Sequence, residues 1–422
     1  MGLFDRRNRF DRRNFLAATG VTALAGSLGL RRGGSGTAVA RTWEHVSERA
    51  EFSTFVRPMR TDDGYLLVGS TRDESFYTSG LVQKVSPDGA LEWEQEYVSQ
   101  DQADLRGEDV QGPVPEDWLS FSLERDGGAL LVGWTYYDNT AVNVARLWAV
   151  DETGSVDAET SLGNLDDASA YSYLTDGVRT DDGYLLCGIE SPGIMLGGAG
   201  WLVSVDENGA VNWHERYPAT ERDLEETFRR DVFNGIASTD GGYVLGGSYE
   251  PEDEDARGWI LGIDDDGSIR WEDRFDLTHD GPTVIYDVEP SDADAYDLLV
   301  VGSYGEFVSR GGQQLPHTPE TVGHGFVAAY TDDGELVWQN EIENTALLCA
   351  TIGPAGVVAG GARSDRGWVG TPARTDFEAD RRGAVAGLCQ GHDDGTLLAT
   401  GRLVDDGNVD AWATIVESPS DG

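Results

Sequence analysis

The sequence predicts an all-β fold that is built from repeated four-stranded units. Three observations indicate this: a composition rich in glycine and aromatic residues, a strand motif that recurs along the chain, and a turn motif that follows it. The chain has 422 residues, among them 55 Gly, 12 Trp and 15 Tyr. A chain of this length exceeds the usual size of a single core unless that core is repetitive. So many aromatic residues exclude a disordered chain.

The first motif is an Asp-Gly or Gly-Gly turn followed by an apolar strand that ends in glycine. It is clearest at 61–70 (TDDGYLLVGS), 180–188 (TDDGYLLCG) and 239–248 (TDGGYVLGGS). Such turns supply the positive φ angles of a tight hairpin, and the apolar residues on either side indicate strands. The final glycine allows neighbouring backbones to approach closely. Seven copies end at Gly69, Gly133, Gly188, Gly247, Gly302, Gly361 and Gly401.

A second turn follows the clear copies and leads to a tryptophan. It occurs at 85–93 (VSPDGALEW), 205–213 (VDENGAVNW) and 263–271 (IDDDGSIRW), and more loosely at 330–338. One repeat therefore contains four antiparallel strands, which is one blade of a β-propeller. We expect a seven-bladed β-propeller over residues 41–422, in which the tryptophan packs between blades.

The N-terminal part of this region supplies a strand that the last repeat lacks. The repeat around Gly401 ends without a fourth strand, whereas residues 41–44 (RTWE) have the form of 91–94 (LEWE) without a preceding turn. We expect the N-terminal strand to complete the last blade, with Trp43 in the place of the repeat tryptophan. Closure of the ring in this way removes exposed sheet edges.

The turn glycine followed four residues later by tryptophan resembles the docking motif of quinoprotein-type β-propellers. The whole unit is similar to the pyrroloquinoline-quinone-like repeats of exported prokaryotic proteins, over roughly residues 41–418. The resemblance implies the fold but no single function, because these repeats occur in dehydrogenases, assembly scaffolds and surface proteins. The dehydrogenases typically have eight blades, a vicinal cysteine pair and a calcium site. This sequence has seven repeats and no adjacent cysteines, so we expect no quinone or other cofactor.

Residues 1–40 are expected to be a targeting segment. Residues 12–16 (RRNFL) precede an apolar run at 17–30, and residues 38–40 (AVA) place small residues at alternate positions. This pattern resembles a twin-arginine export signal. It implies a protein at the cell surface or outside the cell, with the signal either cleaved or kept as a tether. The apolar run is short for a stable membrane span.

The chain is strongly acidic, with 31 Lys and Arg against 76 Asp and Glu and a formal net charge of −45. This balance excludes a protein that binds the nucleic-acid backbone. Molar salt shortens the screening length to roughly 3 Å and removes most of the self-repulsion. The composition therefore resembles the proteome of halophilic archaea. The alternative is an acidic protein that binds cations or basic partners.

The cysteines and histidines assign no catalytic or metal site. Three cysteines are an odd number, so we expect no disulfide framework. Cys349 and Cys389 each lie twelve residues before a repeat glycine and are either a disulfide between adjacent repeats or two buried apolar residues. His317 and His324 are either metal or acid–base residues or ordinary loop residues. The Asp-Gly turns lack the ligand spacing of calcium loops.

The topology of a blade indicates where a site belongs. Both glycine turns of each blade emerge on one face, so the loops of variable length emerge on the other face, around the central channel, where propellers usually bind partners. Residues near the ends of the second strands are a candidate floor for a sugar or peptide there, or else half-exposed strand ends. They are Trp134, Tyr136, Tyr137, Tyr249, Tyr304 and Arg363.

We expect a monomeric, non-catalytic propeller that binds a protein, glycan or other ligand on its variable-loop face. None of the histidines lies in a known catalytic motif, and we assign no catalytic residue. The alternative is a propeller enzyme, either a hydrolase, a lyase or a quinoprotein-like oxidoreductase, with its site on the same face.

Overall fold

The structure, a computed structural model, is built almost entirely of β-strands. The chain divides into two units, Met1–Thr37 and Ala38–Gly422, and all described residues lie in the second. The expected export segment, residues 1–40, lies outside the described residues. Those described are 41–47, 52–75, 77–105, 115–137, 142–163, 165, 171–192, 196–219, 229–252, 254–275, 277, 281–291, 293, 295–305, 323–353, 356–364, 366–371, 374–405 and 408–417.

Four of the sheets consist of four consecutive antiparallel strands each. Their order in space follows their order in sequence, as the repeat predicts. The first two are β6–β9 (Glu116–Arg125, Gly128–Tyr137, Val142–Asp151, Val156–Ser161) and β10–β13 (Tyr171–Thr180, Gly183–Ser191, Ala199–Val205, Val211–Tyr217). The next two are β14–β17 (Val232–Thr239, Gly242–Tyr249, Arg257–Ile263, Ile269–Phe275) and β18–β21 (Thr283–Pro290, Leu298–Tyr304, His324–Tyr330, Leu336–Ile342).

A fifth sheet has eleven strands, in the order β22-β23-β24-β25-β26-β27-β2-β3-β4-β5, and β1 also pairs with β27. The 17-residue strand β25 pairs with β24 through its first half and with β26 through its second half. The first five strands of the chain are β1 (Arg41–Ser47), β2 (Phe52–Thr61), β3 (Gly64–Arg72), β4 (Thr78–Val85) and β5 (Leu91–Tyr97). The last six are β22 (Thr345–Gly353), β23 (Gly356–Arg363), β24 (Arg366–Thr371), β25 (Arg374–Gln390), β26 (Thr396–Asp405) and β27 (Asn408–Glu417). A short helix, α1 (Gln100–Leu105), follows β5.

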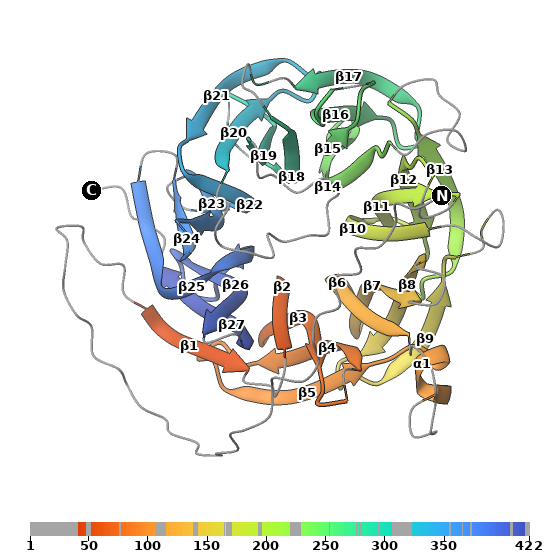
Figure 1. Cartoon of the computed structure of the whole chain (residues 1–422), viewed down its shortest axis with the longest axis vertical. Helices are drawn as coiled ribbons and strands as arrows, with labels where there is room; N and C mark the ends of the chain where they lie inside the picture. The colour runs from red at the N-terminus through yellow and green to blue at the C-terminus, as the bar shows by residue number, and fades with distance from the viewer. Residues whose placement is uncertain are drawn as a thin grey trace, which may run out of the picture. The chain divides into compact units, whose positions relative to one another are not determined.

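The sheets are arranged around a common centre (Figure 1). Strands β2, β6, β10, β14, β18 and β22 lie nearest the centre, each in contact with the next, and strands such as β5, β13 and β21 lie at the periphery. Neighbouring sheets bury apolar side chains between them, for example Leu130 and Leu147 against Tyr184 and Trp201. Radial repetition of four-stranded sheets is the architecture of a β-propeller. The predicted all-β repeat fold is therefore confirmed.

The N-terminal strand joins the C-terminal one, as the sequence predicts. Strand β1 pairs antiparallel with β27, and Glu44 lies opposite Thr414 while Ser47 lies opposite Ala411. The backbone carbonyl oxygen of Trp43 also accepts a hydrogen bond of 2.6 Å from the Thr414 hydroxyl. The two ends of the described chain are therefore tied into one sheet.

Each repeat glycine lies against the backbone of the innermost strand of its sheet. A Cβ atom at Gly69 would overlap with the carbonyl oxygen of Thr54, and one at Gly188 would overlap with that of Tyr173. The same overlap with a carbonyl oxygen of the innermost strand would arise at the other five, Gly133, Gly247, Gly302, Gly361 and Gly401. The close backbone approach predicted for the seven repeat glycines is confirmed.

The innermost strands also share a β-bulge at one level. The bulge directly follows the residue that pairs with the repeat glycine, for example between Leu119 and Phe121 in β6 and between Leu174 and Asp176 in β10. The bulged residues form a set that we call the bulge ring: Val56, Ser120, Thr175, Asn234, Tyr286, Leu348 and Ala386. In β2 the bulge holds one additional residue, Arg57.

The repeat tryptophans of the outer strands pack on the second glycine turn of the next repeat. The ring of Trp43 lies against Gly89 and its Nε1 donates a 3.0 Å hydrogen bond to the Pro87 carbonyl oxygen. Trp271 likewise packs on Gly334, the turn glycine of the following sheet. Trp93 and Trp213 have the corresponding neighbours Gly154 and Gly267. The prediction that these tryptophans pack between blades is confirmed.

The three cysteines are free thiols. Cys187 and Cys349 are buried, and Cys389 is partly exposed. Of the two alternatives that the sequence leaves for Cys349 and Cys389, the structure therefore excludes the disulfide.

Candidate functional site

A cavity of about 480 Å³ lies at one end of the channel through the ring of sheets. All seven residues of the bulge ring line it, among them Ser120, Asn234 and Tyr286. A bulged residue is left out of the ladder of strand hydrogen bonds, so its side chain is re-aimed relative to the rest of the strand. Because every innermost strand has its bulge at the same level, each innermost strand adds its bulged residue to the cavity lining. The bulges come before the first glycine turns in sequence, so this end of the channel is the variable-loop face.

One wall of the cavity is aromatic. Trp118 and Trp134 lie opposite each other on β6 and β7, and their rings stack with centroids 5.5 Å apart and planes 9° apart. Phe52 from β2 contacts Trp118 edge-on at 5.9 Å. The guanidinium of Arg72 lies over the Trp118 ring at 5.9 Å. We call Phe52, Trp118 and Trp134 the aromatic wall.

Arginines supply most of the charge on the cavity lining: Arg57, Arg72 and Arg402 against a single acid, Asp287. Arg72 is held by Glu116, with 3.2 Å between its Nη2 and the carboxylate. The side chain of Arg402 is 8% exposed, and burial lowers its pKa below the ordinary value. Burial disfavours the charged form of a side chain, and for an arginine this lowers the pKa.

Two polar groups on the lining have unused hydrogen-bonding capacity within the described part of the chain. Asn234 is 6% exposed, and its amide nitrogen donates a 2.7 Å hydrogen bond to the Ile285 carbonyl oxygen while its Oδ1 has no partner. A buried polar atom without a partner costs about 1–3 kcal/mol. The second is Trp118, whose indole Nε1 is buried and has no hydrogen-bond partner among the described residues.

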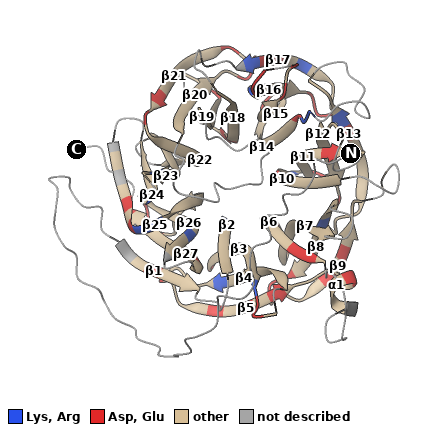
Figure 2. Cartoon of the chain, in the orientation of Figure 1, with Lys and Arg blue, Asp and Glu red and all other residues tan. Residues whose placement is uncertain are grey.

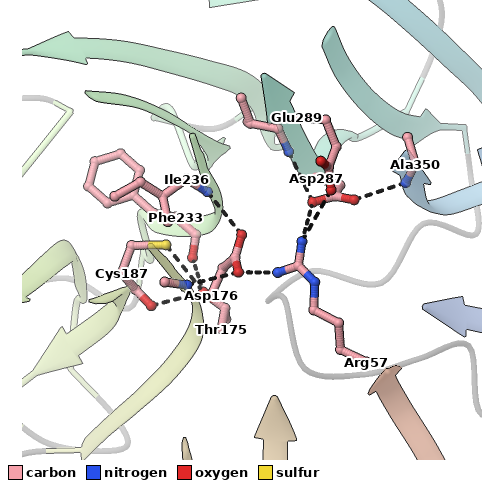
Figure 3. Close-up of polar contacts among 11 residues, drawn as sticks. Arg57, Thr175, Asp176, Cys187, Phe233, Ile236, Asp287, Glu289 and Ala350 are labelled. Atoms are coloured by element: carbon pink, nitrogen blue, oxygen red, sulfur yellow. Dashed lines mark hydrogen bonds and ion pairs between the residues drawn. The ribbon is translucent and has the colours of Figure 1, made fainter. Parts of the chain in front are cut away.

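Three carboxylates hold the guanidinium of Arg57 next to the cavity (Figure 3). We call Arg57 and these residues, Asp176, Asp287 and Glu289, the carboxylate clasp. Arg57 Nη1 pairs with Asp176, and its Nη2 lies 3.1 Å from Asp287 and 3.5 Å from Glu289. These groups come from β2, β10 and β18, which lie on different sides of the channel. The clasp therefore crosses the channel.

Backbone hydrogen bonds extend the clasp to two more strands. Asp176 Oδ2 accepts a 3.1 Å hydrogen bond from the Ile236 amide of β14, and Asp287 Oδ2 accepts one of 2.9 Å from the Ala350 amide of β22 (Figure 3). Both carboxylates thus have an arginine partner and a backbone partner. A network in which each member is satisfied rigidifies a core.

Burial shifts the acid–base properties of the clasp. It raises the pKa of Asp176 to about 6, although the positive charge of Arg57 acts in the opposite direction. Burial raises the pKa of Asp287 as well, and burial together with the charge of Asp287 raises the pKa of Glu289. For Arg57, burial opposes the charge, but attraction by Asp176 and Asp287 outweighs it and raises the pKa.

A second, smaller cavity of about 220 Å³ lies on the turn side of the clasp. Arg57 borders both cavities, while Asp176 and Glu289 border only the smaller one. The clasp therefore separates a cavity on the loop face from one on the turn face.

Of the six candidate residues predicted from the sequence, Trp134 lines the larger cavity. The other five are outside its lining: Tyr136, Tyr137, Tyr249, Tyr304 and Arg363. The expected common floor made of all six does not form around this cavity. Whether the five bind a ligand elsewhere stays a prediction.

Two of these five contact groups of their own sheet. Tyr249 is buried under the guanidinium of Arg274, 5.1 Å from its ring. The Tyr304 hydroxyl donates a 2.7 Å hydrogen bond to Glu341. Tyr304 also stacks on His324, one of the two histidines considered from the sequence. The other histidine, residue 317, lies outside the described residues.

The remaining three also lie outside the cavity lining. The Tyr137 hydroxyl accepts a 2.8 Å hydrogen bond from Arg146 and contacts Asp101 of α1. Arg363 lies over the Trp368 ring at 4.7 Å. Tyr136 is half-buried at the end of β7.

Strand alternation explains why three of the predicted residues lie outside the cavity lining. Successive side chains of a strand point to opposite faces. Tyr249, Tyr304 and Arg363 follow their repeat glycines by two positions, whereas the cavity takes residues one position after the glycine. Those residues are Ser70, Trp134 and Arg402.

Sequence reasoning missed the bulge ring, Trp118 and Arg402. A signal for the bulge ring exists in the sequence, because in five of the seven copies the bulged residue lies thirteen positions before the repeat glycine. The residue types at that position share no chemistry, so only the spacing marks it.

Neither a metal-binding cluster nor a membrane-spanning helix occurs among the described residues. No group of three or more His, Cys, Asp or Glu side chains is placed so that it would hold a metal ion. No helix among the described residues has the length and apolar character of a membrane span.

No protein-family model and no curated protein sequence matches the chain. Among solved structures, it is similar to the β-propeller domain of a trilobed protease from Pyrococcus furiosus, at 12% identity over 89% of this chain and 97% of that chain, with a TM-score of 0.44.

Two further structures are similar at the same level. One is BBS1N in complex with ARL6DN, at 12% identity, 90% and 97% coverage and a TM-score of 0.46. The other is a fucose-specific lectin from Aleuria aurantia, at 10% identity, 88% and 99% coverage and a TM-score of 0.39. At these scores they carry no argument about what this chain does.

Proposed function

We propose that this chain is an exported, non-catalytic, seven-bladed β-propeller that binds a ligand in the cavity on its loop face. The observation that carries the proposal is the bulge ring, because every innermost strand contributes its bulged residue to the lining of the same cavity. Ligand sites are typically concave, mostly apolar and about 300–1,000 Å³ in volume, with a few placed polar groups. The aromatic wall, Arg402 and Asn234 meet this description.

The division of the eleven-stranded sheet supports the count of seven blades. Strands β2–β5 form one group of four, and β22–β24 with the first half of β25 form a second. The second half of β25 with β26, β27 and β1 forms a third. The other four sheets make the total seven, which equals the number of repeat glycines that lie against an innermost strand.

Export rests on the sequence of residues 1–40, with its twin arginines and the alternating small residues that end at Ala40. The proposed location is the cell surface or the medium of a salt-rich environment. Mass spectrometry of the secreted chain tests the processing of this segment: a chain that begins after Ala40 supports export with cleavage, and an intact N-terminus contradicts cleavage after Ala40.

Binding is tested with Trp134→Ala, which removes one half of the stacked pair. Purified protein in molar salt would be titrated with a panel of glycans, small organic acids and extracellular proteins, with tryptophan fluorescence as the signal. We expect a ligand whose affinity falls about tenfold or more in the variant, the loss typical of a central aromatic contact.

The matched control is Tyr249→Phe, which alters a candidate that lies outside the cavity lining. We expect its affinity to equal that of the unaltered chain. A ligand whose binding is lost in Tyr249→Phe and kept in Trp134→Ala would place the site elsewhere and overturn the proposal.

The enzyme alternative has one observation in its favour, namely the raised carboxylate pKa values of the clasp, since such shifts gather at active sites. Asp176 and Asp287, however, each have both an arginine and a backbone amide as partners. An acid–base group must reach a proton of its substrate, and these carboxylates already accept hydrogen bonds across the channel. The geometry favours a structural role for the clasp.

A further inference from the structure

Two arginines lie side by side at the loop-face end of β23 and β24, outside the cavity lining (Figure 1). Arg363, one of the six candidate residues predicted from the sequence, ends β23 and lies directly opposite Arg366, which begins β24. We call these two residues the arginine pair. On the other side of Arg366, Arg382 of β25 lies opposite it and has an interaction partner of its own. Three neighbouring strands therefore place arginines in register at this end of the sheet.

The arginine pair lacks the ion pairs that other arginines of this chain form. Most described arginines pair with a carboxylate, as Arg72 does with Glu116. Within the part of the chain that the structure describes, neither Arg363 nor Arg366 forms such a pair. Like charges directly opposite each other destabilise a sheet. An anion that contacts both guanidinium groups would relieve this repulsion.

The guanidinium of Arg363 is held in place by uncharged groups. Its Nε donates a 2.7 Å hydrogen bond to the Thr345 hydroxyl, and its Nη1 donates one to the Thr375 hydroxyl. The guanidinium also lies over the Trp368 ring, 4.7 Å from the ring centroid. Its Nη2 has no hydrogen-bond partner among the described residues. A side chain that is already fixed loses little conformational freedom when it binds a ligand, which favours affinity.

Arg366 is exposed to solvent and follows a tight hairpin loop, which consists of residues 364 and 365. Ser364 has a φ angle of 47°, in the left-handed region that favours glycine. Backbone strain of this kind persists where the surrounding structure fixes it, and it is common at ligand sites. The hairpin therefore keeps the two arginines opposite each other.

The surroundings of Arg363 favour the approach of an anion. Burial lowers the pKa of Arg363 below its ordinary value, although the negative charge of Glu378 opposes this shift. Glu378 lies on β25 opposite Trp368 and forms no ion pair with Arg363. An opposite charge in contact with a cation stabilises its charged form. A bound anion would supply the contact that Glu378 does not.

From these contacts we propose that the arginine pair is a second binding site on the loop face, which takes a doubly charged oxyanion, namely phosphate, a phosphate monoester or sulfate. Two opposed guanidinium groups match two negative charges, and their N–H groups suit the oxygen atoms of such an anion. Neither arginine lines the loop-face cavity. The inference therefore goes beyond the proposed function.

The experiment measures anion binding to the full chain by isothermal titration calorimetry in molar KCl. This salt screens the distant negative charges of the chain, but it weakens contacts at hydrogen-bond distance much less. The ligands are inorganic phosphate, glycerol 1-phosphate, sulfate and acetate. We expect the three doubly charged anions to bind about tenfold or more tightly than acetate, which carries one charge. Equal affinity for acetate and the other anions would overturn the inference, and the two phosphate ligands distinguish a free ion from an ester.

The pH dependence of binding is a second test. A phosphate monoester takes up a proton at about pH 6, whereas sulfate keeps both of its charges. Glycerol 1-phosphate should therefore bind more weakly well below this pH than well above it, while the affinity for sulfate stays the same. Sulfate also reports any effect of pH on the protein itself. If glycerol 1-phosphate binds equally at both pH values, the site does not require two charges and the inference is wrong.

Two variants and a matched control locate the site. Arg366→Gln is expected to weaken phosphate binding about tenfold or more, because a charged hydrogen-bond donor is lost. Arg363→Lys is expected to retain part of the affinity, because it keeps the charge but loses the planar fork that Thr345 and Thr375 hold. The control is Arg60→Gln in β2, since Arg60 is also exposed and also forms no ion pair among the described residues. We expect the control to bind phosphate as the unaltered chain does.

The control separates a specific site from general attraction to arginines. Equal losses of phosphate affinity in Arg366→Gln and Arg60→Gln would show that phosphate is only a counter-ion, and the proposed site would not exist. Thermal unfolding provides an independent readout, because a bound ligand stabilises the folded state. Phosphate should raise the midpoint of unfolding of the unaltered chain more than that of Arg366→Gln.

Failure of this inference and failure of the proposed function can be told apart. Trp134→Ala alters the cavity and should leave the affinity for phosphate unchanged. If Trp134→Ala loses phosphate binding while Arg366→Gln keeps it, the anion binds in the cavity. In that case the inference about the arginine pair fails and the proposed function stands.

Discussion

Arg57 is a single residue that links three innermost strands across the centre of the ring. The other innermost strands have one bulged residue each, whereas β2 has two, and the second of them is this arginine. Its guanidinium holds carboxylates that two other strands direct into the channel. Removal of one partner from a buried ionic network typically costs about 3–5 kcal/mol, because the remaining charges stay buried without compensation.

The pKa of Asp176 predicts a specific pH dependence of stability. Burial raises this pKa from 3.8 to about 6 in the folded chain, so the folded state binds the proton more tightly than the unfolded state. The stabilisation that the proton provides is complete below pH 3.8 and is lost as the pH rises through about 6. Asp176→Asn carries no such proton. Relative to this variant, the free energy of unfolding of the unaltered chain should rise by on the order of 1–3 kcal/mol when the pH falls from 7.5 to 5.

Thermal unfolding in molar salt at the two pH values measures this difference. Asp151→Asn is the control of opposite sign, because hydrogen bonds from the Thr153 side chain and the Ser155 amide lower the pKa of Asp151. The unaltered chain should lose stability relative to that variant when the pH falls through the acidic range. A difference between the unaltered chain and Asp176→Asn that does not change with pH would contradict the assigned burial of the Asp176 charge.

At the scale of elements, β1 joins the two ends of the described chain. It covers the edge of β27 that would otherwise be exposed, and its Trp43 reaches the turn between β4 and β5 at Gly89. The same strand therefore pairs with the last strand and contacts the first repeat (Figure 1). Uncovered edges are sites of aggregation.

We predict that Trp43→Ala lowers the free energy of unfolding by about 2–4 kcal/mol, through lost burial and the lost hydrogen bond to Pro87. Denaturant unfolding in molar salt measures the change. The control is Leu91→Ala at the start of β5, where the leucine is 50% exposed and the expected change stays within about 0.5 kcal/mol. Equal effects of the two substitutions would show that Trp43 does not anchor β1.

The elements that the sequence predicted well are those with local signals. Each hairpin of the repeat has a glycine turn, and each repeat glycine marks a close backbone approach, so both follow from a few neighbouring residues. Strand β25 has no such signal, because the region 370–380 lacks the turn motif, and its division between two partners depends on the neighbouring strands.

The candidate site was harder to predict than the fold. The end of the channel at which the cavity lies was predicted from topology, but the identity of the lining residues depends on which face of a strand each side chain takes. Trp134 was included because it is an aromatic residue close to the end of a second strand. Arg402 follows its glycine by the same one position and was missed, because the prediction took residues two positions after the glycine.

At the scale of the whole molecule, the acidic charge lies mainly on the outside. Figure 2 shows acidic residues on outer strands such as β5 and β9 and on α1. In β5 the acidic residues Glu92 and Glu94 are exposed to solvent, as is Asp157 in β9. Such a surface repels itself unless the solvent screens it.

We predict that the midpoint of thermal unfolding falls when the salt concentration is reduced from molar to millimolar. The physical reason is that the screening length grows from about 3 Å to about 30 Å, so the surface carboxylates repel one another across the ring. Calorimetry over a series of KCl concentrations measures the midpoint. A midpoint that rises as salt is removed would contradict adaptation to brine.

The pairing of β1 with β27 has a consequence for biosynthesis. The first strand of the described chain leaves the ribosome hundreds of residues before its partner, so the nascent polypeptide has no completed structure to fold into until translation has nearly ended. A prematurely terminated product that lacks β27 leaves both β26 and the N-terminal strand β1 without that partner. Unpaired strands of this kind are features that proteases and chaperones recognise in unfinished chains.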